Sequence, residues 1–165
     1  MESNEFNIMA KKLGAEDSKI IDTDTIITAP WVILKCRYGC PNYNTSTCCP
    51  PLTPTYKEMQ EVINCYKKAI LIKTKECDKT TGIIVKLERE IFLSGFYKAF
   101  GLGSGPCRLC TKCNKEKCNN KAEARPSMEA CGIDVFQTAQ NNGFNIEVLN
   151  SKEAEQNSFG LVLIE

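Results

Sequence analysis

Histidine is completely absent from the 165 residues of this sequence. Its absence excludes zinc sites built from cysteine and histidine, histidine-ligated haem, two-histidine iron sites and any nucleophile activated by histidine. Soft metal ligation by this chain must therefore come from thiolates alone.

Long apolar runs and a charge imbalance are also missing. The longest apolar segments, WVILK at 31–35 and AILIK at 69–73, have the length of a strand, so we expect no transmembrane helix. The net charge is +1 and 25% of the residues are charged, a profile typical of globular proteins rather than of nucleic-acid-binding arms. No basic stripe with interleaved aromatic residues is present. We therefore expect neither a membrane nor a nucleic acid as partner.

The sequence is rich in cysteine, with eleven in the chain. The polar N-terminus, with charges of both signs, lacks the basic and apolar regions of a secretory signal, so we expect a cytoplasmic protein. In the cytoplasm disulfide frameworks are rare, and clustered cysteines bind metal or carry out redox chemistry. The odd count agrees, because at least one thiol cannot pair within the chain.

The stretch GPCRLCTKCNKEKC at 105–118 holds the densest cysteine cluster. Three thiols at Cys-x2-Cys-x2-Cys spacing converge on one face of a tight loop, as in bacterial ferredoxins, and this favours an iron–sulfur cluster. Zinc, which more often takes two separate Cys-x2-Cys pairs, is the alternative. The preceding glycines, Gly103 and Gly105, allow backbone amides to approach and bind the cofactor; they could equally form an ordinary helix stop and loop. The predicted ligands here are Cys107, Cys110, Cys113 and Cys118.

A second candidate site lies upstream, in CRYGCPNYNTSTCCPP at 36–51. It contains Cys36, Cys40, Cys48 and Cys49. Consecutive side chains seldom point at the same ion, so we expect one of the adjacent pair not to be a ligand. The spacing matches no ordinary zinc knuckle.

Three segments together resemble a known family: LKCRYGCPNYNTSTCCPP, GPCRLCTKC and ARPSMEACGIDVF. They are similar to the signatures of the DUF2284 family, predicted metal-binding proteins found mainly in anaerobic bacteria and archaea. The resemblance runs from about Leu13 to Glu165 and implies metal or iron–sulfur binding without naming a reaction. The upstream family motif has a cysteine directly before two prolines, which is Cys49 here, and does not require Cys48. The sequence YN at 43–44 departs from the family's usual Tyr-Gly.

Counting ligands leaves several arrangements open. Cys36, Cys40 and Cys49 are three for the first site, the second stretch supplies four, and Cys131 is an eighth candidate. Cys118 either closes its own cluster or crosses to the first, as the remote cysteine does in two-cluster ferredoxins. If it crosses, Cys131 can complete the second cluster. Otherwise the first cluster uses Cys48 or Cys131, or leaves one iron open, as catalytic zinc sites keep an open position. Cys131 could instead be a small buried hydrophobe.

Other residues near the clusters receive weaker assignments. Six basic and two acidic residues between 107 and 125 would offset an anionic cluster and attract an acidic redox partner, or simply form a solvated face. Glu129 and Asp134 are the acid/base candidates if the protein is an enzyme, a question that the sequence leaves open. We expect Cys65 to be buried in a helix and Cys77 to be an exposed thiol without a role.

The chain reads as one α/β domain over residues 1–165, with a mixed sheet flanked by helices and both cysteine-rich, metal-binding loops at one end. We expect helices at about 4–13, 56–66, 82–100 and 126–142, the second begun by a capping box of Thr55 and Glu58. Strands are expected at 19–22, 25–28, 31–35, 69–73, 144–149 and 159–165.

The favoured function is electron transfer by a redox accessory protein of anaerobic metabolism that carries [4Fe-4S] clusters, most simply two. One alternative is an enzyme that uses an open iron of one cluster. The other is a zinc-stabilised structural or interaction module.

Overall fold

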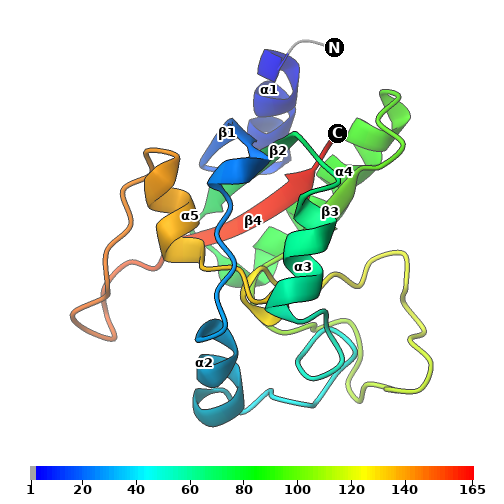
Figure 1. Cartoon of the computed structure of the whole chain (residues 1–165), viewed down its shortest axis with the longest axis vertical. Coiled ribbons are helices and arrows are strands. Elements are labelled where there is room, and N and C mark those ends of the chain that lie inside the picture. The colour runs from blue at the N-terminus through cyan, green and yellow to red at the C-terminus, as the bar shows by residue number, and fades with distance from the viewer. Residues whose placement is uncertain (1–2) are drawn as a thin grey trace.

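Four strands form one antiparallel sheet at the centre of the computed structural model, which describes residues 3–165 (Figure 1). The strand order is β1-β2-β4-β3, with all three pairings antiparallel. The strands are β1 (Asp17–Asp22), β2 (Lys68–Thr74), β3 (Phe100–Leu102) and β4 (Ser158–Leu163). The α/β class is confirmed, whereas the mixed sheet is wrong. The helix between β2 and β3 does make these two strands parallel, but β4 lies between them and runs against both.

Helices and loops cover the two faces of this sheet. On one face, Ile70 and Ile72 of β2 and Val162 of β4 pack against helices α1 (Ser3–Leu13) and α4 (Cys77–Leu93). On the other face, Leu71 and Leu161 pack against α3 (Tyr56–Ile63) and the segment 128–133. Alternate residues of a strand point to opposite faces, so a strand covered on both sides is apolar throughout, as AILI is.

Several expected elements are confirmed. The helix near the N-terminus ends before Gly14, whose φ of 114° suits glycine. The hydroxyl of Thr55 accepts a hydrogen bond from the Glu58 amide, and the Glu58 carboxylate accepts one from the Thr55 amide, so the capping box is present. The strands predicted at 19–22, 69–73 and 159–165 correspond to β1, β2 and β4.

The strand predicted for WVILK is wrong, because this segment opens helix α2 (Val32–Gly39). Val32 is buried, but Trp31 is 47% and Leu34 53% exposed, so the apolar run does not fill a sheet interior. Two backbone bonds hold the entry to α2 beside the segment around Gly132: the Ala29 amide donates to the Gly132 carbonyl at 2.9 Å, and the Asp134 amide to the Ile27 carbonyl at 2.7 Å. α2 is therefore fixed next to η2 (Glu129–Cys131), away from the sheet edge.

The long helix predicted from Pro126 is also wrong. Gly132, with a φ of 78°, ends η2 after one turn, and a new helix, α5 (Val135–Asn141), starts three residues later. Asp134 caps α5, its carboxylate accepting a hydrogen bond from the Gln137 amide at 3.0 Å. The chain therefore turns sharply directly after Cys131.

Three further expectations require correction. The segments 25–28 and 144–149 form no strands; the first contributes the short helix η1 (Thr23–Thr25) and an isolated bridge from Thr28 to Ile133. The helix predicted at 82–100 is α4, which begins at Cys77 and ends at Leu93. Cys65 lies exposed beyond the end of α3 rather than in the core. Within residues 3–165, no helix has both the length and the apolar character needed to cross a bilayer.

Candidate metal centre

The two cysteine stretches, far apart in the sequence, meet at one end of the molecule. α2 and the loop that follows it lie beside the loop that follows β3, on the side of the structure opposite α1 (Figure 1). The Lys115 ammonium donates to the Asn44 carbonyl at 3.0 Å, which joins the two loops. The Thr53 hydroxyl donates to the Ala130 carbonyl, which fastens the end of the first loop to η2. Three chain segments thus enclose the cysteines.

Cys36, Cys40 and Cys49 form what we call the first cysteine group. Cys36 and Cys40 lie one turn apart at the C-terminal end of α2, where residues four apart share a face. Burial raises the pKa of the Cys36 thiol, and the neighbouring Cys40, Glu129 and Cys49 raise it further. Cys36 thus has Cys40, Cys49 and Glu129 as neighbours. The helix that sequence reasoning missed is therefore the element that pairs Cys36 with Cys40.

Cys48, Cys107 and Cys118 form a second cysteine group. Burial and the neighbouring Cys107 and Cys118 thiols together raise the pKa of Cys48 to about 12. Cys48 and Cys49 thus have different neighbours, although they are adjacent in the chain. The family motif does not require Cys48, and the sequence named it only as one possible ligand of the first cluster. Its position beside Cys107 was not predicted. The doubled cysteine before Pro50 was the available signal.

Cys131 is buried close to Cys48 and Glu129. It is 1% exposed and packs among core residues such as Met128 and Ile133. Burial raises the pKa of its thiol to about 12, with further contributions from Cys48 and Glu129. The position of Cys131 suits a small core residue, but it also lies next to Cys48 of the second cysteine group. Metal binding by Cys131 therefore stays a prediction.

The remaining residues of the second stretch are less enclosed. Cys110 is exposed, and its sulfur accepts a hydrogen bond from the Asn120 amide group at 3.0 Å. Cys113 is half-buried. The structure brings Cys107 and Cys118 to the first loop, while Cys110 faces solvent.

Tight packing explains the glycines that precede this stretch. The Gly103 amide donates to the Pro126 carbonyl at 2.8 Å, and a Cβ there would lie 2.2 Å from the Thr81 hydroxyl oxygen. Gly105 has a φ of 69°, and its Cβ would lie 2.9 Å from the sulfur of Cys77. Both positions therefore require glycine for steric reasons. That these two residues bind a cofactor stays a prediction.

The spread of the thiols bears on the kind of metal. Across residues 3–165, no three cysteine, aspartate or glutamate side chains converge closely enough to hold one metal ion. Zinc holds its four sulfurs at about 2.3 Å, so the ligands of one ion nearly touch. An iron–sulfur cluster takes its thiolates on separate irons, so they stand further apart around it.

A buried ion pair holds the segment after the second stretch in place. The Arg125 guanidinium donates to both carboxylate oxygens of Glu88 at 2.7 Å, and both side chains are at most 15% exposed. The Gly101 amide also donates to this carboxylate at 2.7 Å. Arg125 lies just before η2, so α4 and β3 position the segment that carries Glu129 and Cys131.

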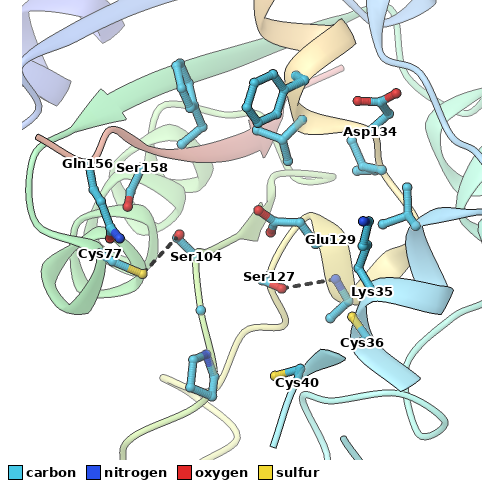
Figure 2. A pocket seen from close by; sticks show the side chains of 18 of the residues that line it. Lys35, Cys36, Cys40, Cys77, Ser104, Ser127, Glu129, Asp134, Gln156 and Ser158 are labelled. Atoms are coloured by element: carbon cyan, nitrogen blue, oxygen red, sulfur yellow. Dashed lines mark hydrogen bonds between the residues drawn. The ribbon is translucent and has the colours of Figure 1, made fainter. Parts of the chain in front are cut away.

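A cavity of about 880 Å³ adjoins the first cysteine group. Cys36 and Cys40 lie on one side of it, Cys77 and Ser104 lie opposite, and Glu129 projects between them (Figure 2). Cys77, predicted to be an exposed thiol, is half-buried, and its sulfur and the Ser104 hydroxyl form a hydrogen bond of 3.4 Å. Glu129 meets solvent through the cavity, but the surrounding protein raises the pKa of its carboxyl. Catalysis by Glu129 and Asp134 stays a prediction.

Comparison with protein-family models matches residues 19–164 to the DUF2284 family, described as predicted metal-binding proteins. The match contains both cysteine stretches and the segment 125–136. No curated protein and no solved structure matches the chain.

Proposed function

Because the chain belongs to the DUF2284 family of predicted metal-binding proteins, we propose that it binds two [4Fe-4S] clusters and transfers electrons as a redox accessory protein of anaerobic metabolism. The observation that carries the proposal is the division of the thiols into two groups that meet at Cys48 and Cys49. Two groups served by adjacent residues suit two neighbouring clusters, between which an electron has a short path.

Each cluster has its own set of ligands in this proposal. Cys36, Cys40 and Cys49 hold the first cluster. The second is held by Cys107, Cys110 and Cys113, with Cys118 as the fourth ligand. Cys48, a member of the second cysteine group, is adjacent in the chain to Cys49, and Cys131 lies close to Cys48; either can complete the first cluster. Without metal, the raised pKa values of Cys36, Cys48 and Cys131 keep these thiols protonated at neutral pH, so each of them that binds metal must release its proton.

The bound clusters would supply one-electron redox chemistry, and the chain's residues would determine how an electron enters and leaves. The second stretch lies at the surface, with Cys110 exposed and basic residues on either side. Positive charge next to an anionic cluster favours its reduced form and attracts an acidic partner protein. The first group faces the cavity.

The direct test is the metal content of protein purified without oxygen. We expect a brown protein in which iron and acid-labile sulfide are close to equimolar, as a [4Fe-4S] cluster requires. A colourless protein that contains zinc without sulfide would reject the proposal and leave the zinc-stabilised interaction module.

One observation favours an enzyme as the second candidate. The cavity lies against the first cysteine group, for which the family motif supplies three thiols. If neither Cys48 nor Cys131 binds, one iron of the first cluster faces this cavity without a protein ligand.

A further inference from the structure

The cavity beside the first cysteine group has the size and the lining of a small-molecule site. Its volume of about 880 Å³ lies within the range of roughly 300–1,000 Å³ found for such sites. It is lined by residues of α2, η2, the start of α5 and the segments 146–149 and 156–159. A cluster held by Cys36, Cys40 and Cys49 would occupy the part of the cavity that these thiols line, whereas the part lined by Trp31, Phe136 and Phe159 lies outside the first cysteine group.

Apolar side chains form most of the wall. Trp31 before α2, Phe136 of α5 and Phe159 of β4 contribute aromatic rings from three sides. Trp31 and Phe136 are 47% and 41% exposed. Aromatic rings gathered around a concave space gain free energy when a ligand covers them, and they select an apolar or aromatic body.

The charged groups that face this apolar space are mainly acidic. They are Lys35, Glu129, Asp134 and Glu147. The Asp134 carboxylate accepts a hydrogen bond from the Gln137 amide as the cap of α5. Glu129 interacts with Ser127 and projects into the middle of the cavity, next to Cys36 (Figure 2). A carboxylate has about four acceptor positions, so Glu129 can still accept from a ligand.

We propose that the cavity binds a small organic amine with an apolar or aromatic body, its ammonium group against Glu129 and therefore beside the first cysteine group. The apolar walls contact the apolar body of the ligand. The Glu129 carboxylate loses part of its hydration because protein surrounds it, and a bound cation compensates part of that loss. The binding site goes beyond electron transfer, and it uses the part of the cavity that a cluster on the first cysteine group would leave free.

The ligand class can be tested with three probes of the same carbon skeleton: phenylbutylamine, phenylbutanol and phenylbutyrate. Trp31 is the only tryptophan in the chain and lines the cavity, so its fluorescence reports occupancy directly. Calorimetry of the anaerobically purified protein gives the dissociation constants. We expect the amine to bind at least about tenfold more tightly than the alcohol, because hydrogen bonds to charged groups contribute about 1.5–3 kcal/mol. The acid should bind most weakly.

Two variants separate the charge from the apolar wall. Glu129→Gln should remove the preference for the amine over the alcohol and leave binding of the alcohol unchanged. Phe136→Ala should weaken all three probes. Glu90→Gln and Phe92→Ala, exposed positions of α4 outside the cavity, are the matched controls and should alter nothing.

Iron and sulfide measured in every sample distinguish this proposal from the proposed function. A brown wild-type protein that binds none of the probes, or binds all three equally, would overturn the amine site and leave electron transfer intact. A protein without clusters that still prefers the amine would support the site while rejecting the proposed function. If Glu129→Gln fails to fold, the three probes on the wild type and on Phe136→Ala still decide the question.

Discussion

At the scale of single residues, the cysteines divide into those that the metal needs and those that it does not. Replacing Cys110 by serine removes a proposed ligand of the second cluster, so the anaerobically purified variant should lose about half of its iron and sulfide. Cys65→Ser is the matched control, because Cys65 is exposed beyond α3 and its thiol donates a hydrogen bond to the Glu61 carbonyl, outside both cysteine groups. If both variants lose the same amount of iron, the ligand assignment is wrong.

A second residue-scale prediction concerns the pair of Arg125 and Glu88. Glu88→Gln leaves a mostly buried guanidinium without its countercharge, a change that costs about 3 kcal/mol. The melting temperature should fall by roughly 6–12 °C, measured by circular dichroism. Glu76→Gln breaks the exposed pair with Lys79 and should change the melting temperature little. Equal effects of the two variants would show that the Arg125 pair is no more important than a surface contact.

At the scale of elements, the turn after η2 sets the position of Cys131. Gly132 has a φ of 78°, and a Cβ would lie 2.8 Å from the Cα of Tyr56 at the start of α3. Gly132→Ala combines a left-handed residue with a clash against backbone, so we expect about 3 kcal/mol of destabilisation, seen as a lower melting temperature together with loss of iron. Gly82→Ala, in α4 with open space around it, should instead stabilise by about 1 kcal/mol. A Gly132→Ala protein as stable as the wild type would contradict this role of the turn.

The elements that the sequence predicted well are those whose signal is local. Thr55 and Glu58 reveal the start of α3 because a capping box needs only four residues, and AILI reveals β2 because burial on both faces leaves no polar position among these four residues. WVILK fails by the same rule: four apolar residues do not distinguish a strand from the first turns of a helix. What the run actually packs against is decided by the segment around Gly132, about a hundred residues later.

The candidate site shows the same difference between features that short stretches encode and features that depend on contacts between distant segments. The cysteine motifs and the expectation of metal binding come from spacing within short stretches, which the sequence displays directly. The proximity of Cys48 to Cys107 depends on two loops meeting across the molecule, and no local pattern encodes it. The cavity could not be predicted either, because its walls come from six separate segments.

At the scale of the whole molecule, the fold brings the two cysteine groups together at one end. Adjacent Cα atoms lie about 3.8 Å apart, so clusters bound near Cys48 and Cys49 must be close neighbours. In the fully reduced protein, the unpaired electrons of two neighbouring clusters interact. We therefore expect a broadened, split electron paramagnetic resonance spectrum that is absent when only one cluster is reduced.

The same measurement on single variants tests whether both groups contribute. Cys40→Ser removes a ligand of the first group and should leave the simple spectrum of one cluster even after full reduction. Cys65→Ser should retain the split spectrum, since Cys65 lies outside both groups. Two clusters whose signals merely add would mean that the groups do not bind metal where the fold places them. The wild-type splitting, lost in Cys40→Ser and kept in Cys65→Ser, would instead show that the first cysteine group holds one of two neighbouring clusters.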